Sequence, residues 1–182
     1  MRNTTCTGIV AAVAITAGLA GCVSTGWQGK LNGDLRLFGH RNWIVVVDSA
    51  YPAQTAAGTE TVATGEDQLD AVKKVLQAVD SARHVRPVIY LDAELPHVSE
   101  ADAPGISAYR KKLTELLAKR TVKSVPHEEL IAKLDTAAKT FRVLILKTNL
   151  TLPYTSVFLE LDCGYWSTEA QQRLRDAMRA TN

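Results

Sequence analysis

Four side chains that can transfer a proton or bind a hydroxyl group stand beside apolar runs of the sequence. His40 precedes the run Trp43–Val47, Asp48 follows it, and His127 and Tyr154 come later in the chain. Histidine can donate or accept a proton near neutral pH, aspartate can bind hydroxyls, and tyrosine offers a hydroxyl and an apolar ring face. These residue types indicate proton transfer on, or binding of, a small polar ligand.

Each of these residues also has an ordinary structural alternative. His40 can be a helix-end histidine bonded to backbone, and His127 can be an inconsequential first residue of a helix. Asp48 ends a buried strand, where a carboxylate needs a partner or a ligand, and Asp92 ends another apolar run. His84 and His97 are expected at the surface. The four histidines show no close metal-ligand spacing, so we expect no metal site.

Strands and helices alternate along the sequence that must position these residues. Apolar runs predict strands at 43–47, 88–91, 121–125, 142–146 and 155–161, with a short strand near 61–63. Helical periodicity and capping residues predict helices at 34–38, 67–82, 106–119, 126–139 and 167–179. This order predicts an α/β fold: a three-layer α/β/α sandwich whose central sheet is largely parallel, with room for a mixed arrangement. Ligands of such folds gather beyond the strand ends, which favours Asp48.

The first block of the sequence has the layout of an export signal. Arg2 is its only charged residue, and residues 8–21 are small or apolar. The run is too short for a membrane-spanning helix, and it ends in Leu-Ala-Gly-Cys at 19–22, which resembles a bacterial lipobox. We therefore expect residues 1–21 to be removed as a lipoprotein signal peptide and Cys22 to carry the lipid. The glycine-rich residues 22–33 are expected to form a tether, and 34–182 a single domain with an extra C-terminal helix.

Val23 after the lipidated cysteine implies the cell envelope as location, lipid-anchored at the periplasmic face of the outer membrane. Of the three cysteines, Cys6 would leave with the signal and Cys22 would carry lipid, so Cys163 would stand alone, as a small buried side chain. The formal net charge of +2, without a long basic run, gives no reason to expect a nucleic-acid partner. Membrane contact is expected through the lipid alone.

Three short motifs in order carry a resemblance to a known family. Residues 38–52, FGHRNWIVVVDSAYP, resemble the Gly-His, apolar strand, Asp-Ala-x-x-Pro signature of the D-ribose pyranase and L-fucose mutarotase family. Residues 126–130, PHEEL, are similar to its Thr-His-Glu segment, and 153–159, PYTSVFL, resemble its Pro-Tyr-x-Asn strand. Together they cover about residues 31–165.

The resemblance implies a cofactor-free isomerase that interconverts ring forms or anomers of a free monosaccharide by acid–base ring opening. It implies His40 as the catalytic acid/base, with sugar bound by Asp48, His127, Tyr154, Thr155 and Ser156. It also implies ring-shaped homo-oligomers with sites between subunits. Strand length agrees with a shared site, because five residues at ~3.3 Å each separate the two ends of the strand 43–47 by about 16 Å, so His40 and Asp48 of one chain would lie apart.

The sequence also departs from the family pattern. Ser156 stands where the family carries a sugar-binding Asn, and serine cannot offer an amide's donor and acceptor together. Thr148-Asn149-Leu150 stands where relatives carry Gly-Glu. Two functions therefore stay open: a sugar mutarotase or pyranase, and a non-catalytic envelope lipoprotein that binds a sugar or protein partner on the same fold.

Overall fold

A single mixed sheet forms the centre of the protein. The computed structural model describes residues 26–180, and within them six strands assemble in the order β2-β5-β1-β6-β3-β4. β6 is antiparallel to its neighbours β1 and β3, whereas the other neighbouring pairs are parallel. The strands are β1 (Trp43–Val47), β2 (Thr59–Ala63), β3 (Val85–Asp92), β4 (Val122–Val125), β5 (Val143–Lys147) and β6 (Val157–Cys163).

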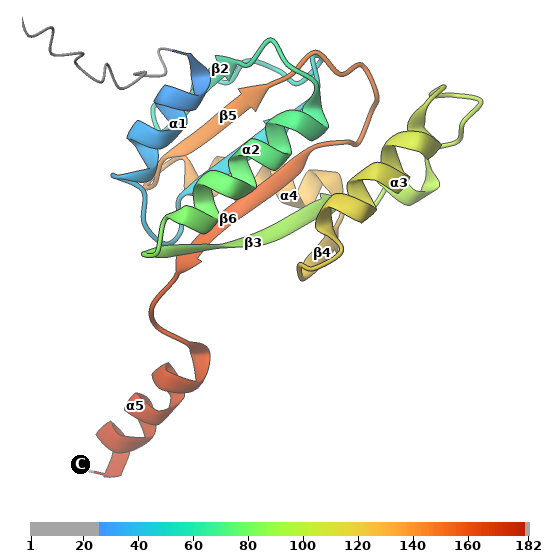
Figure 1. The fold of residues 1–182 in the computed structure, drawn as a ribbon. Coiled ribbons are helices and arrows are strands. Elements are labelled where there is room, and N and C mark those ends of the chain that lie inside the picture. The colour runs from blue at the N-terminus through green and yellow to red at the C-terminus, as the bar shows by residue number, and fades with distance from the viewer. Residues whose placement is uncertain (1–25, 181–182) are drawn as a thin grey trace, which may run out of the picture.

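Helices cover both faces of this sheet and make three layers. Figure 1 shows α2 lying across one face and α4 behind the sheet. The apolar side chains of α1, α2 and α3 share one core with Ile44 and Val46, whereas those of α4 share the core on the opposite face with Val45 and Val47. The helices are α1 (Trp27–Leu35), α2 (Gln68–Ser81), α3 (Ile106–Leu117), α4 (His127–Ala137) and α5 (Thr168–Ala180), with a short 3₁₀ turn at Leu95–His97. The expected three-layer α/β fold with a largely parallel, mixed sheet is confirmed.

β1 is buried along its whole length, as its continuous apolar run predicts. Its alternate side chains enter the two different cores, which explains why both faces had to be apolar. β3 begins three residues before the expected start at 88, because Val85 pairs with Cys163 at the far end of the antiparallel β6. Sequence pattern therefore located the strands, and pairing set their ends.

The expected tether at 22–33 is wrong from residue 27 onward, and so is the expected start of the domain at 34. Trp27, Leu31 and Leu35 are buried at four-residue spacing on one side of α1 and join the core beside α2. The glycines at 29 and 33 lower the intrinsic helix propensity, but burial of this apolar stripe outweighs that cost. The domain accordingly begins near Trp27.

The expected signal peptide at 1–21 and the lipidated Cys22 lie outside the described residues. Among residues 26–180, no helix combines the length and the apolar character needed to span a membrane.

The C-terminal helix α5 stands apart from the rest of the domain. Figure 1 shows it leaving the end of β6 and extending away from the sheet. None of its residues is buried, and Leu174 and Met178 are exposed on it. The extra C-terminal helix is thus present, but it adds nothing to the core.

Candidate functional site

Strand direction brings most of the predicted site residues to one edge of the sheet. β1 and β3 both end at this edge, where Asp48 follows β1 and Asp92 is the last residue of β3. β6 starts there, because Val157 pairs with Val46 of β1 and with Leu91 of β3. We call the group Asp48, Asp92, His127 and Tyr154 the His127 end.

His127 is held at this end by two carboxylates. Asp92 pairs with Val125, the last residue of β4, and the chain then turns at Pro126 into α4. The Nδ1 atom of His127 lies 2.9 Å from Oδ1 of Asp92, and its backbone N–H donates to both carboxylate oxygens of Glu94 at 3.1 Å. Glu94 thereby occupies the capping place that Pro126 cannot fill. The imidazole is thus fixed before any ligand arrives.

Asp92 is the only charged residue in the buried class among the described residues. Its side chain is 0% exposed, whereas that of His127 is 27% exposed. The second carboxylate oxygen, Oδ2, is buried and has no hydrogen-bond partner within residues 26–180. Burial raises the pKa of Asp92, and the hydrogen bond from His127 opposes this shift only in part. The carboxylate therefore sits in an energetically costly place.

Tyr154 lies against His127 in an unusual backbone conformation. The two rings meet edge to face with their centroids 5.6 Å apart, and Tyr154 is 41% exposed. Its φ is +55°, in the left-handed region that side chains other than glycine rarely adopt. The only other such residue that the structure describes outside glycine is Arg41, with φ +73°, directly after His40. Left-handed backbone thus accompanies both predicted site regions, as it often does at functional sites.

A buried polar network holds the segment that follows Tyr154. The carbonyl of Thr155 accepts hydrogen bonds from the amide of Gln68 and from the Tyr109 hydroxyl, the latter at 2.9 Å. Gln68 also donates to Tyr109 and accepts from the Thr148 hydroxyl. Thr155 is 0% and Ser156 2% exposed, so neither side chain reaches the surface of the isolated chain. That these two residues contact a ligand stays a prediction.

Asp48 is partly exposed at the same end. Its Oδ1 accepts from the backbone N–H of Ala50 at 2.7 Å, which fixes the carboxylate above the end of β1. Its charge, with that of Glu94, adds to the upward shift of the pKa of Asp92. The His127 end thus holds three carboxylates, of which Asp92 contacts the imidazole directly. No group of three or more His, Cys, Asp or Glu residues within the described chain is arranged to hold a metal ion.

His40 lies at the opposite end of β1, as strand length predicts. β6 ends there: the backbone N–H of Arg41 donates to the carbonyl of Leu161, and Arg86 pairs with Asp162 across β3 and β6. Arg86 donates to Oδ2 of Asp162 at 2.9 and 2.6 Å. Burial would raise the pKa of Asp162, but hydrogen bonds from Arg86 and the Cys163 N–H hold that pKa below its usual range. We call the group His40, Arg86 and Asp162 the His40 end.

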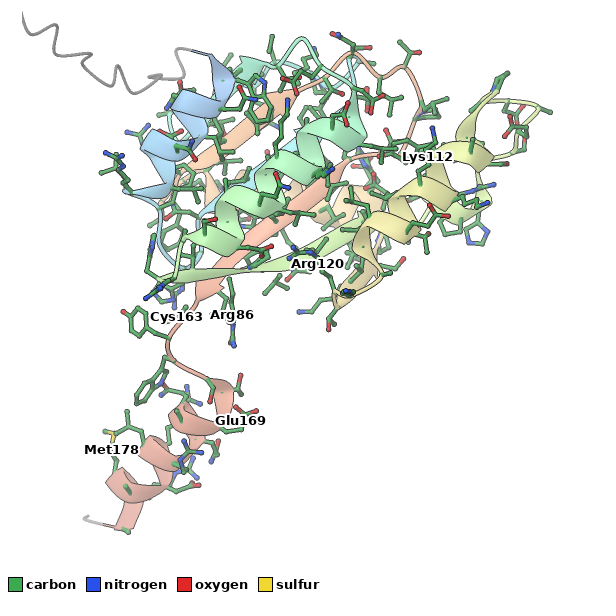
Figure 2. All side chains as sticks on the ribbon, in the orientation of Figure 1. Arg86, Lys112, Arg120, Cys163, Glu169 and Met178 are labelled. Atoms are coloured by element: carbon green, nitrogen blue, oxygen red, sulfur yellow. The ribbon has the colours of Figure 1, made fainter. Side chains whose placement is uncertain are left out.

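A cavity of about 620 Å³ opens at the His40 end, between the sheet and the start of α5. Figure 2 shows Arg86 and Cys163 at this end, with Glu169 and Met178 farther out along α5. Cys163 lines the cavity and is partly exposed, so the expectation that it is buried is wrong. Cys163 is the last residue of β6, where the chain leaves the sheet toward α5, so the helices no longer cover it. The cavity is also lined by His40, Trp166, Gln171 and Arg175, and by none of the His127-end residues.

Sequence reasoning missed the role of several supporting residues. Asp92 was a candidate only as a strand-end residue, and its neighbours in the sequence gave no indication that it would pair with His127, 35 positions away. Gln68, Tyr109 and Glu94 carried no motif. The single available signal was a polar residue, Gln68, at the buried start of an otherwise regular amphipathic helix.

Comparison with known proteins identifies the family of this fold. The model of the RbsD / FucU transport protein family matches residues 28–163, three quarters of the chain. The chain belongs to this family. The resemblance carried by the three motifs is therefore confirmed. No curated protein sequence matches the chain.

Solved structures of RbsD / FucU proteins share the fold at low identity. The Bacillus subtilis RbsD complexed with D-ribose is 16% identical, with a TM-score of 0.52, and the match covers 82% of this chain and 98% of that one. A Streptococcus pneumoniae fucose mutarotase in complex with L-fucose is 20% identical, with a TM-score of 0.48, over 73% of this chain and 91% of that one. The match to RbsD supports the common fold and says nothing by itself about the ligand of this chain.

Proposed function

We propose that the protein opens and recloses the ring of a free monosaccharide and so interconverts its ring forms or anomers. The observation that carries the proposal is the placement of Asp48, His127 and Tyr154 together at one end of β1, with His40 at the other. Family membership supports it, because the two compared structures were solved as complexes with ribose and fucose. Histidine, aspartate and tyrosine suit the chemistry without any cofactor.

Ring opening of a cyclic hemiacetal needs two proton transfers. A base takes the proton of the anomeric hydroxyl, an acid gives a proton to the ring oxygen, and the bond between the anomeric carbon and the ring oxygen breaks. The product is the open-chain aldehyde, and closure on the other face, or through another hydroxyl, reverses the steps. A positioned acid or base contributes on the order of 10²–10⁴-fold to such a step. His40 is proposed for one transfer, and Asp48 and Tyr154 for holding sugar hydroxyls.

The proposed site is shared between copies of the chain. His40 lies at the far end of a strand from Asp48, about 16 Å away at ~3.3 Å per residue, too far to act on one small sugar. The cavity at the His40 end has room for a monosaccharide but lacks the residues of the His127 end. A second copy presenting its His127 end to this cavity would complete the set. Head-to-tail contact of this kind generates a closed ring of subunits when the rotation from one copy to the next closes.

Exchange NMR tests the activity directly. The purified chain from Trp27 onward is mixed with ribose, fucose or galactose, and magnetisation exchange between anomers and ring forms is measured. We expect acceleration with at least one sugar, and its loss in His40→Ala. His97→Ala is the matched control, because His97 is exposed on the 3₁₀ turn and belongs to neither end. Wild-type protein that accelerates exchange of no sugar would overturn the proposal.

Ligand binding without catalysis is the second candidate. The buried Ser156, which stands where the family motif has a sugar-binding Asn, favours it over catalysis. The same samples distinguish the two candidates by saturation transfer from protein to sugar. Binding without accelerated exchange would support the second candidate, and Tyr154→Ala is expected to abolish that transfer.

We also propose that the full chain is a lipoprotein of the cell envelope, anchored through Cys22. The support is the sequence at 19–22 alone. Metabolic labelling with an alkyne fatty acid tests it: label is expected on the wild type, and none on Cys22→Ser. Cys163→Ser is the control and should label fully. Equal labelling of Cys22→Ser and wild type would refute the anchor.

A further inference from the structure

The pair of Asp92 and His127 has features that stability does not explain. A buried carboxylate with one unpartnered oxygen costs free energy, and its partner is a histidine that carries charge only when protonated. Replacing a buried ion pair by well-packed apolar side chains of similar volume is often neutral or stabilising. Because stability does not account for the buried carboxylate of Asp92, its burial indicates a role in function.

The hydrogen bond fixes which nitrogen of His127 carries the proton. A carboxylate oxygen can only accept, so at 2.9 Å the Nδ1 atom of His127 must donate to Asp92. The other nitrogen, Nε2, then has a free lone pair, and it makes no hydrogen bond to any residue from 26 to 180. With the side chain 27% exposed and the ring edge-to-face with Tyr154, Nε2 is available to a ligand.

Side chains from several elements lie around this imidazole and its partner Asp92. Asp92 contacts it from β3, and Glu94 holds its backbone N–H from the turn after β3. Asp48 acts on Asp92 from the end of β1, and Tyr154 presents its ring from the segment before β6. A proton arriving at Nε2 would therefore make an imidazolium hydrogen-bonded to the carboxylate of Asp92.

We propose that Asp92 is a positioning residue that makes His127 a second proton-transfer group, beyond its expected part in binding sugar. Asp92 holds the Nδ1–H tautomer and the ring orientation, so that Nε2 takes a proton from a sugar hydroxyl and returns it to an oxygen of the sugar. The negative charge of Asp92 stabilises the transient imidazolium, and no proton passes to the carboxylate itself. The proposal rests on the proposed function, since it needs a sugar at the His127 end.

NMR of the wild-type protein provides a test that needs no activity. Histidine labelled with ¹⁵N gives different nitrogen shifts and couplings for the two tautomers, and the His127 signals are assigned by their absence in His127→Gln. We expect His127 in the Nδ1–H tautomer at neutral pH, whereas exposed His97 should show the Nε2–H form that free histidine prefers. A His127 in the Nε2–H form would overturn the proposal even if the protein proved active.

The variant Asp92→Asn tests the consequence. Its amide can accept from or donate to Nδ1, so the tautomer preference should be lost, and we expect kcat for ring exchange to fall by at least about 10-fold with little change in KM. Asp80→Asn is the control, because Asp80 is an exposed carboxylate that pairs with Arg120. Asp92→Glu, which keeps the acceptor, should recover part of the rate.

Stability and activity separate the outcomes. Asp92→Asn is expected to unfold at or above the wild-type Tm, so a lost rate cannot come from a lost fold. Wild-type kcat in a folded Asp92→Asn would overturn the positioning role while leaving the proposed function standing. If Asp92→Asn does not fold, the tautomer of the wild type decides. If no sugar is turned over, the proposed function fails, and the tautomer measurement still decides whether Asp92 orients His127.

Discussion

The two ends of the central sheet hold their candidate residues in different ways. At the His127 end, the imidazole is fixed by Asp92 and Glu94, and the backbone after Tyr154 is fixed by Gln68 and Tyr109. At the His40 end, His40 is exposed and borders a cavity whose outer wall is α5, a helix without a buried residue. One end is organised by its own chain around the imidazole, whereas the other has open space beside the ion pair of Arg86 and Asp162. A site assembled from both would combine a rigid half with an open half.

Complementation between two inactive variants tests most strongly whether the two ends of neighbouring copies form one site. His40→Ala and His127→Ala should each lose nearly all exchange activity. Co-expressed, they should recover about a quarter of it, because with random assembly a quarter of the interfaces join an intact His40 to an intact His127. The measurement is exchange NMR on the mixed oligomer, with separately purified and then mixed variants as the control for subunit exchange.

Complementation fails if each chain carries a complete site. Recovered activity near zero in a verified mixed oligomer would show that the two ends do not meet, and the shared site would have to be abandoned.

The buried network of the His127 end should also dominate stability. Gln68→Ala removes three hydrogen bonds and leaves the Thr155 carbonyl and the Thr148 hydroxyl short of a partner, so we expect a loss of about 3 kcal/mol in the free energy of unfolding. Gln77→Ala, on the exposed side of the same helix, is the matched control and should change it by less than about 0.5 kcal/mol. Urea denaturation measures both. Equal effects would mean that the network contributes nothing.

The sequence predicted the strands of this arrangement better than the contacts between residues that are far apart in the chain. The apolar run before Asp48 and the motif at 153–159 predicted a buried strand and a nearby tyrosine, because strand burial leaves a local pattern. The hydrogen bond between Asp92 and His127 joins positions 35 apart, and the parallel pairing of β3 with β4 is what brings them to one edge. Such contacts leave no local spacing to read. The helix at Trp27 was hidden for another reason: glycines suggested a tether, and only the core shows why the residues fold.

Stability at different pH values should report on Asp92. Because burial raises the pKa of Asp92, the folded protein holds more protons than the unfolded chain between the usual pKa of this carboxyl and its raised value. The free energy of unfolding should therefore fall as pH rises through that range. Asp92→Asn removes this titration and should be more stable than wild type at neutral pH by about 1 kcal/mol. Urea denaturation between about pH 3.5 and 8 measures the two slopes.

Arg41, beside the His40 end, is not expected to contribute to this pH dependence of the free energy of unfolding. Replacing Arg41, which lies 5.8 Å from the centre of the Phe141 ring, should leave the pH slope of stability unchanged. If the pH slope of the free energy of unfolding disappeared in Arg41→Gln, the titrating group would lie at the His40 end, and its assignment to Asp92 would be wrong.

The smallest expected effect concerns the left-handed residue at the His127 end. Tyr154 has φ +55°, which glycine adopts without strain, so Tyr154→Gly should stabilise the fold by up to about 1 kcal/mol while removing the ring that packs on His127. Tyr165→Gly is the control: Tyr165 is 78% exposed and has no positive φ, so the same replacement should give no gain. Thermal unfolding of the two variants, with ring exchange on the same samples, tests this. A more stable Tyr154→Gly that binds no sugar would mean that the strain at Tyr154 is kept for the ligand, because only the aromatic ring, and not the fold, requires that residue.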